Sequence, residues 1–497
     1  MARLIVIVAT MIAIALLANH FLLQGGDVPP PGALDAPAEK AVVEEPAKEK
    51  AASKSATEAV DQESASDKVA DTVQAAGAAE ETAPASPATQ DVVAEAPIAP
   101  VGKPAEETVL LGEDDLTAGV PGEGDLTLDE IRAWVSDAKN HVVLKPQLPL
   151  GLDAGAGEIQ GLDENPLTRA KIELGRQLFF DPRLSKDGTI SCASCHDPEF
   201  GYAKDTQFGV GIAGQTGNRN SPVAYNRILS GPQFWDGRAS SVEEQAVGPI
   251  ANPIEMGHEH EACVAQLREI PGYVAQFDAA FPGIGLTLDG VAQAIASFER
   301  TLVTGPAPWD HYQALKSFEQ AYAEDLEPEY LGEFEEDDPE AFAQYQALKA
   351  AAEANPISAS AVRGGEIFSS NKGGCPACHG GANFTDEKYH NRGGGMDADE
   401  PDLGRYVVTE VEADKGAFKT PTVRNVALTA PYMHDGSQQT LEEVVEWYAK
   451  GGHPNPWLSD KVLKLELTDQ DKADLVAFMK EGLTSKLPKV ERGRLPE

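Results

Sequence analysis

The sequence predicts a mostly α-helical protein whose folded part consists of two related halves with long irregular loops. Apolar residues recur at the three- and four-residue spacing of helices, while strand-like alternation is scarce. Segments between the expected helices, such as 209–222 and 391–403, are rich in Gly, Pro and Asn, which is typical of loops. The halves are related because a helical stretch followed by a Cys-x-x-Cys-His motif occurs twice.

The chain begins with an apolar segment. Residues 4–23 are almost continuously apolar, a length that suits one membrane span. The same length suits a long signal peptide, but the small-x-small cleavage site at 13–15 lies inside the apolar run. We therefore expect residues 1–24 to be an uncleaved membrane anchor or, failing that, a signal segment. Either assignment directs the rest of the chain out of the cytoplasm.

The next segment, residues 25–125, is rich in Ala, Pro, Glu, Ser and Val, and it has almost no aromatic residues. Such a composition buries too little apolar surface to offset the entropy lost on ordering. We expect a disordered tether that gives a membrane-held protein reach, or a spacer without a specific role. A connecting helical segment, 126–159, follows, with Leu128, Ile131 and Trp134 at helical spacing.

Further helices are predicted on both sides of the repeated motif. Apolar faces occur between Leu167 and Phe179 and between Leu441 and Tyr448, and capped starts occur at Thr287 and Thr468. Similar elements precede the two motifs, at 173–179 and 363–368. The repeat predicts two domains, one at 160–345 and one at 355–485.

The chain is strongly acidic, with a formal net charge of −40. Nucleic acid is excluded as a partner class, because phosphate binding needs clusters of Lys and Arg. A dense acidic block at 324–340 lies near the junction of the two halves. We expect this block to be a solvated loop. An acidic surface of this kind would steer a basic partner protein.

The motifs themselves indicate the chemistry: Cys192, Cys195 and His196 form the first, and Cys375, Cys378 and His379 form the second. This spacing is typical of covalent c-type haem attachment, in which the thiols form thioethers and the histidine binds the iron. A zinc knuckle or a thiol redox pair is the alternative. The histidine in the same position after both pairs favours two haems, and hence two cytochrome-c-like haem domains. The fifth cysteine, Cys263, is expected to be a buried free thiol.

Seven longer stretches carry a family resemblance: 190–198, 219–222, 233–238, 245–257, 298–302, 419–425 and 431–436. In these stretches, and in their order, the sequence resembles bacterial dihaem cytochrome c peroxidases and their MauG-type relatives. The resemblance covers roughly residues 160–485. The anchor, the tether and the acidic block lie outside it.

The resemblance implies that the first haem is the peroxide site, with His196 as its proximal iron ligand. Glu255 and Gln245 match the distal catalytic pair, and Trp235 matches a tryptophan that passes electrons between the haems. A carboxylate over an open iron face moves a proton from one peroxide oxygen to the other. Without the resemblance, Glu255 would be read as a surface residue and Trp235 as a core residue.

For the second haem, the resemblance implies His379 as the proximal ligand. The distal ligand of typical peroxidases is a methionine, and Tyr448 stands at that position, as in the MauG-like pattern. Met433 is the competing ligand, and a plain core role for Tyr448 is the other alternative. Typical peroxidases also block the peroxide site with a histidine, but 197–257 contains none. We therefore expect a peroxide site that is open without prior reduction.

The resemblance also implies a calcium ion between the domains. Asn220 matches its asparagine ligand, and Thr429 and Pro431 match positions that offer backbone carbonyls. Calcium prefers such oxygen ligands.

Three functions are compatible with these features. The first is a periplasmic, membrane-anchored cytochrome-c peroxidase that reduces hydrogen peroxide with electrons from a small cytochrome c or cupredoxin. The second is a MauG-like oxidase that modifies side chains of a partner protein through high-valent iron, and Tyr448 favours it. The third is a non-catalytic dihaem electron carrier, against which Glu255 and Gln245 argue.

Overall fold

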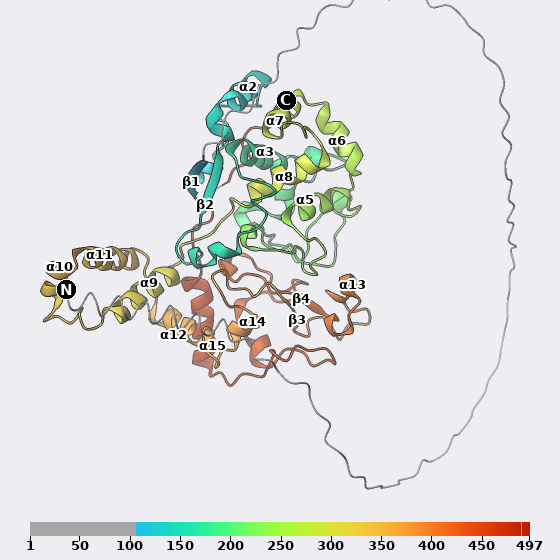
Figure 1. The fold of residues 1–497 in the computed structure, drawn as a ribbon. Coiled ribbons are helices and arrows are strands. Elements are labelled where there is room, and N and C mark those ends of the chain that lie inside the picture. Colours follow the sequence, from blue (N-terminus) through green and yellow to red (C-terminus); the bar gives the residue numbers. More distant parts are fainter. Residues whose placement is uncertain (1–105, 489) are drawn as a thin grey trace, which may run out of the picture. The chain divides into compact units, whose positions relative to one another are not determined.

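The computed structural model describes residues 106–488 and 490–497. The predicted anchor and most of the predicted tether lie outside this range. The described chain is mostly helical, as expected, with four short strands (Figure 1). None of its helices is long and apolar enough to cross a bilayer.

The α-helices are α2 (Leu128–Ser136), α3 (Arg169–Phe180), α4 (Cys192–Cys195), α5 (Val242–Ala251), α6 (His260–Arg268), α7 (Pro271–Ala280), α8 (Leu288–Glu299), α9 (Pro308–Ala321), α10 (Leu331–Asp337), α11 (Pro339–Ala354), α12 (Ala359–Phe368), α13 (Tyr406–Thr409), α14 (Leu441–Ala449) and α15 (Asp469–Ala477). The strands are β1 (Glu106–Leu110), β2 (Val143–Gln147), β3 (Tyr389–Asn391) and β4 (Ala417–Lys419). The predicted starts at Thr287 and Thr468 are confirmed, because each side chain accepts a backbone N–H and caps its helix.

The ordered fold begins earlier than the composition predicts. β1 lies within 25–125, the range assigned to the tether, and it pairs in parallel with β2. The reason is burial: Val109, Leu111 and Leu116 join the first hydrophobic core. Three apolar residues in an acidic, Gly-rich surrounding gave no periodic signal, and their partner strand lies more than thirty residues further on.

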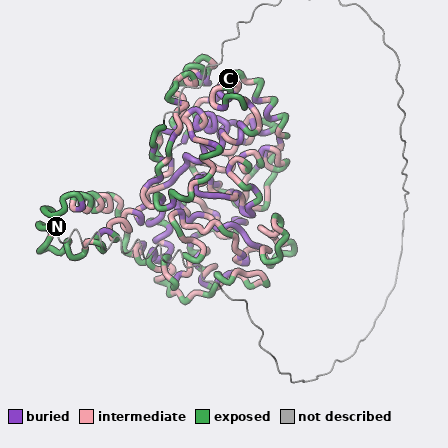
Figure 2. The backbone as a smooth tube through the Cα atoms, in the orientation of Figure 1, coloured by how far each residue is buried: buried purple, intermediate pink, exposed green. Residues whose placement is uncertain are grey.

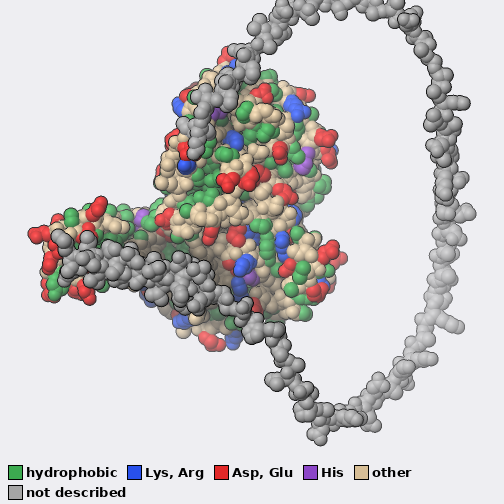
Figure 3. Space-filling view, in the orientation of Figure 1, with side chains coloured by type: hydrophobic (Ala, Val, Ile, Leu, Met, Phe, Trp, Pro, Cys, Tyr) green, Lys and Arg blue, Asp and Glu red, His purple; other side chains and the backbone are tan. Residues whose placement is uncertain are grey.

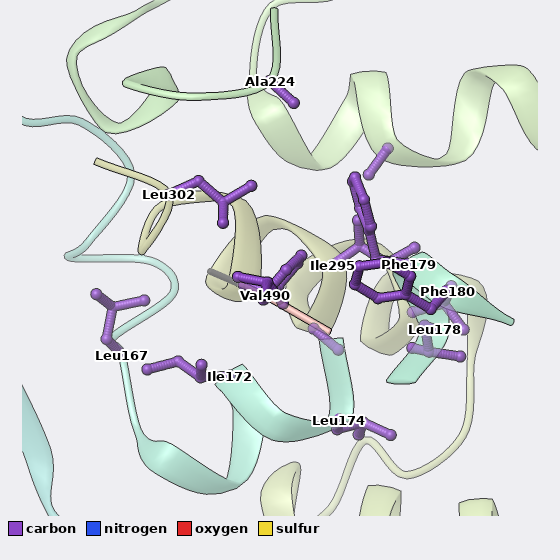
Figure 4. Close-up of a cluster of buried hydrophobic side chains, with 14 of the residues drawn as sticks. Leu167, Ile172, Leu174, Leu178, Phe179, Phe180, Ala224, Ile295, Leu302 and Val490 are labelled. Carbon is purple, nitrogen blue, oxygen red and sulfur yellow. The ribbon is translucent and has the colours of Figure 1, made fainter. Parts of the chain in front are cut away.

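The first core lies where α3 crosses α8. Leu174, Leu178 and Phe179 of α3 pack with Ile295 of α8, and all four are buried (Figure 4). The crossing is close because Gly175 has no side chain. A Cβ there would lie 1.9 Å from the carbonyl oxygen of Ala294.

The second core repeats this arrangement. α12 crosses α15, and a Cβ on Gly364 would lie 1.8 Å from the carbonyl oxygen of Asp474. Phe368, Phe478 and Trp309 fill the core beside the crossing. The helix before each haem motif therefore uses a glycine to approach its partner helix, which is the structural form of the repeat seen in the sequence.

The acidic block is only partly a loop, which corrects the sequence-based expectation: residues 324–330 are turns, whereas 331–337 form α10 and Pro339 begins α11. α11 packs along α9, and α10 packs against α11, so the three helices form an arm that projects from the rest of the described chain (Figures 1 and 2). Phe318, Phe334 and Ala341 form a small core of their own, with Tyr322 and Tyr345 packed against it. These aromatic residues recur at helical spacing among the acidic ones, whose side chains cover the outside of the arm (Figure 3).

The C-terminal segment, residues 484–497, returns from the second core to the first, and we call it the strap. The Tyr202 hydroxyl donates a hydrogen bond to the Pro488 carbonyl (2.8 Å), and Val490 is buried in the first core. The Leu126 amide donates to the Leu495 carbonyl (2.8 Å). The strap thereby joins the second core, the first core and the segment before α2.

Candidate active site

The first haem motif lines a cavity of about 250 Å³. Cys192 and Cys195 lie at the two ends of the one-turn helix α4, which Ser191 begins with a capping interaction. The His196 amide donates to the Cys192 carbonyl (2.9 Å), so the histidine closes the turn. Residues three apart on a helical turn share a face, and both thiols and the imidazole line the same cavity.

The second haem motif lines a separate cavity of about 120 Å³. Cys375, Cys378 and His379 lie along its wall. The Nδ1 atom of His379 hydrogen-bonds to the Phe384 carbonyl (3.1 Å), which leaves Nε2 as the ligand atom. Burial lowers the pKa of His379 to about 4, so the ring is neutral, as an iron ligand must be.

The two cysteine pairs line different cavities, which excludes one zinc ion shared between them. Cys378, Asp386 and His390 have potential ligand atoms within 4.8 Å of one another. Cys378 is one of the two cysteines of the second haem motif, so these three residues are not an independent metal site. Each cavity holds the two thiols and the histidine of its own motif, the complete attachment and proximal-ligand set of a c-type haem.

Both predicted distal residues line the first cavity. Gln245 lies on α5, and Glu255 follows in the turn that the Asn252 carbonyl closes by accepting the Glu255 amide (3.1 Å). The loop at Gly211 fits against this turn, because a Cβ there would lie 2.0 Å from the Ile254 carbonyl oxygen. Burial raises the pKa of the Glu255 carboxyl, and the positive charge of Arg238 opposes this rise.

Trp235 lies in the wall of the first cavity and is 8 % exposed. Its indole N–H donates to the Asn220 carbonyl (2.8 Å), and its own carbonyl accepts the Lys419 amide (2.8 Å). Thr420 and Pro421, which follow Lys419, line both cavities. Trp235 is therefore one hydrogen bond away from the segment that separates the two cavities.

The two candidate ligands of the second iron are in different places. Tyr448, on α14, lines the second cavity with the attachment residues. Met433 lines the first cavity instead, at a backbone φ of 73°. Burial raises the pKa of the Tyr448 phenol, and the charge and hydrogen bonding of Arg392 oppose that rise.

The three predicted calcium ligands, Asn220, Thr429 and Pro431, all line the first cavity. The Asn220 amide donates to the His434 carbonyl (2.7 Å), which joins its loop to the loop that carries the other two. Its side-chain amide donates to the Gln207 carbonyl (3.1 Å), which leaves the side-chain oxygen for a cation. An amide oxygen near backbone carbonyls is compatible with calcium.

Five charged residues of the first cavity have no role in the sequence-based site: Arg219, Arg227, Arg238, Glu299 and Lys419. The Arg238 guanidinium lies 3.5 Å from the centroid of the Phe234 ring. All of them except Arg227 lie inside the stretches that carry the resemblance. Their position in those stretches was the available signal, but their burial against the cavity follows only from the tertiary structure.

Comparisons with known proteins support this site. The family model described as di-haem cytochrome c peroxidase matches residues 169–317. The methylamine utilization protein MauG of Methylorubrum extorquens is 37% identical over 320 residues, which are 63% of this chain and 78% of that protein. The cytochrome c551 peroxidase of Pseudomonas aeruginosa is 33% identical over 346 residues, which are 68% of this chain and 86% of that protein.

A solved structure, described as a MauG-like protein associated with microbial copper homeostasis, is similar as well. It is 30% identical, has a TM-score of 0.54, and the match covers 66% of this chain and 93% of that one. Sequence, fold and cavity residues agree. The chain is an enzyme that belongs to the di-haem cytochrome c peroxidase and MauG family.

Proposed function

We propose that this enzyme reduces hydrogen peroxide to water at the first cavity, with electrons that a small cytochrome c or cupredoxin delivers at the second cavity. One observation carries the proposal: Glu255 and Gln245 line the same cavity as the first haem-attachment motif. A plain electron carrier needs no acid–base residue there. The reaction consumes two electrons and two protons for each peroxide and yields two water molecules.

In this reaction the bound haem supplies a redox-active iron, held by His196. Glu255 accepts the proton from one peroxide oxygen and returns it to the other, which becomes the leaving water. Its raised pKa increases its affinity for that proton. Gln245 donates a hydrogen bond that orients the peroxide. The range 197–257 contains no histidine that would block this side.

Electrons pass from the second haem to the first through Trp235. The Trp235 carbonyl accepts a hydrogen bond from the Lys419 amide, and the two residues after Lys419 line both cavities. This contact supports the route. A calcium ion held by Asn220, Thr429 and Pro431 would stiffen the loop to which the Trp235 indole donates its hydrogen bond. The two haem domains extend over 160–345 and 355–485.

Tyr448 favours a second candidate function. As a ligand of the second iron, an anionic phenolate lowers the reduction potential relative to methionine. That would suit a MauG-like enzyme, which withdraws electrons from side chains of a partner protein. In either function we place the enzyme in the periplasm, held at the inner membrane by residues 4–23 through the tether.

A peroxide assay of the holoenzyme separates these functions, after mass spectrometry has confirmed two attached haems. We expect rapid oxidation of reduced cytochrome c that needs no prior reduction of the enzyme. A long-lived spectral change of the fully ferric enzyme, without donor turnover, would favour the MauG-like function. If neither the ferric nor the reduced enzyme reacted with peroxide, both candidate functions would be contradicted.

A further inference from the structure

Glu299 is a buried carboxyl that the proposed peroxide chemistry does not use. It is the last residue of α8, lines the first cavity, and is 6 % exposed. Within the described residues its carboxylate has no hydrogen bond and no ion pair. The neighbouring Arg300 pairs instead with Glu243 on α5 (2.9 Å). An unpaired carboxyl in such a place is costly when it is ionised.

The second half of the molecule has a methionine at the equivalent position. At the α3–α8 crossing, a Cβ on Gly175 would meet the Ala294 carbonyl and Phe298, and at the α12–α15 crossing a Cβ on Gly364 would meet the Asp474 carbonyl and Phe478. The next residues along the chain are Glu299 in the first half and Met479 in the second. Each lines its own haem cavity. The two cavities therefore differ by one ionisable group at a matched place.

Charged groups on several elements act on Glu299. Arg227, which begins a 3₁₀ turn, and Arg300, the C-cap of α8, favour the ionised form, while Glu243 on α5 disfavours it. Cys192 on α4 is the nearest attachment thiol that senses its charge, and in the holoprotein it is an uncharged thioether. Burial outweighs the two arginines and raises the pKa of Glu299 to about 8.

We infer that, at pH values where Glu299 is ionised in the ferric enzyme, it binds a proton from solvent when the first haem receives an electron, so that charge in this cavity stays balanced. The inference deepens the proposed function and rests on it. One electron from the donor converts ferric to ferrous iron, and one proton converts the Glu299 carboxylate to the carboxylic acid. An added negative charge in a poorly screened cavity strengthens proton binding by a carboxylate that faces it. Met479 gives the second haem no such partner.

The test is a spectroelectrochemical titration of both haems in the full-length holoenzyme between pH 6 and pH 10. We expect the midpoint potential of the first haem to be flat on the acidic side and to fall with pH near pH 8. Glu299→Gln keeps the shape of the side chain, and Glu299→Met copies the second cavity. Both variants should lose the fall near pH 8, while Glu299→Asp should retain a fall.

The second haem is an internal control, since its pH dependence should be the same in all four proteins. A wild-type potential that does not change near pH 8, or a fall that persists in Glu299→Gln, would overturn the inference. If the substituted proteins fold poorly, the infrared difference spectrum of the wild type decides. At pH 9, where Glu299 is ionised in the ferric enzyme, reduction should produce a new carboxylic-acid C=O band, and its absence would also overturn the inference.

Different results would contradict the proposed function and this inference. An enzyme whose first haem is absent or inert to peroxide would contradict the peroxidase function whatever the pH dependence of its potential. An active peroxidase without a Glu299-dependent fall would retain the function and exclude the proton uptake described here.

Discussion

At the scale of single residues, the first cavity contains two carboxyls in different roles. Glu255 lines the cavity together with the attachment motif and has Arg238 nearby, whereas Glu299 lies at the end of α8 without a hydrogen-bond partner in the described chain. Burial raises both pKa values, and positive charges oppose the rise at each site: Arg238 at Glu255, and Arg227 and Arg300 at Glu299. In our proposals, the same residue type serves as a proton carrier for peroxide in one place and as a charge-balancing group in the other.

The first prediction concerns Glu255. We expect Glu255→Gln to lower kcat/KM for peroxide by about 100-fold or more, since a positioned acid–base residue contributes about that factor. Both haems should remain attached, as judged by mass and by the absorption spectrum. Glu335→Gln, on the exposed face of the arm, is the matched control and should retain full activity. Wild-type kinetics in Glu255→Gln would show that another group carries the proton.

The second prediction concerns the pH profile. Glu255 must be ionised to accept a proton, so activity falls as the pH drops through its raised pKa. In Arg238→Gln the opposing positive charge is gone, so the pKa of Glu255 rises further and the acidic limb of kcat/KM moves to higher pH. Arg132→Gln, at an exposed ion pair on α2, is the control and should leave the limb in place. A limb that stays or moves to lower pH in Arg238→Gln would contradict the assignment.

The third prediction distinguishes the ligands of the second iron. Tyr448→Phe removes the phenol oxygen from the second cavity, so the spectrum of the second haem alone should change. Met433→Leu should leave that spectrum unchanged, because Met433 lines the first cavity. Low-temperature electron paramagnetic resonance of the ferric protein separates the two haem signals. If Met433→Leu changed the spectrum of the second haem and Tyr448→Phe did not, Met433 would be the ligand instead.

At the scale of elements, the two glycine-mediated helix crossings set the positions of the haem motifs. α3 leads to α4 and its cysteines, and α12 leads to the second motif. Each helix therefore fixes both a core and the start of an attachment loop. The predicted helices with capped starts were confirmed because the caps and the apolar spacing are local in sequence. Helices α10 and α11 were not predicted, because their charges outweighed the few aromatic residues.

The fourth prediction tests the first crossing. Gly175→Ala places a Cβ against the Ala294 carbonyl and should destabilise the protein by about 1–3 kcal/mol. Gly332→Ala is the matched control, since Gly332 is a helical glycine on α10 with no atom within 4 Å of an added Cβ. That change should be neutral or stabilise by about 0.5–1 kcal/mol. Thermal unfolding of the holoproteins measures both, and equal effects would contradict the crossing argument.

At the scale of the whole molecule, the strap and the segment between the cavities connect the two halves. The strap follows the second core in the sequence, yet its residue Val490 is buried in the first core. Tyr225 adds a further connection, since its hydroxyl donates to the Arg424 carbonyl (2.6 Å). The wall between the two cavities contains Trp235 from the first half and Pro421 from the second half, so both halves are needed to form it. Electron transfer between haems requires that this arrangement persist.

The fifth prediction concerns the strap. A chain that ends at Lys486 loses the burial of Val490 and the partner of Leu126, and we expect at least about 2 kcal/mol of lost stability. Hydrogen exchange should increase first in α2 and α3, which the strap covers. Exchange that increases equally in α12 and α15 would show that the strap does not act mainly on the first half.

The sequence alone determined the attachment chemistry, the two related halves and most helix positions. Two thiols and a histidine within five residues define a haem site wherever the chain folds. The capped apolar stretches define helices in the same local way. The resemblance also named the residues that the structure brings to the two cavities, including Glu255, Gln245 and Tyr448.

Only the tertiary structure decided which side chains share a cavity. Tyr448 and Met433 are fifteen residues apart in the chain, yet they line different cavities. The burial of Glu299 and the pairing of β1 with β2 likewise depend on partners that are distant in sequence. A side chain's neighbours set its desolvation and its charge environment. Those neighbours come from helices that meet only in the folded chain, so no local pattern encodes them.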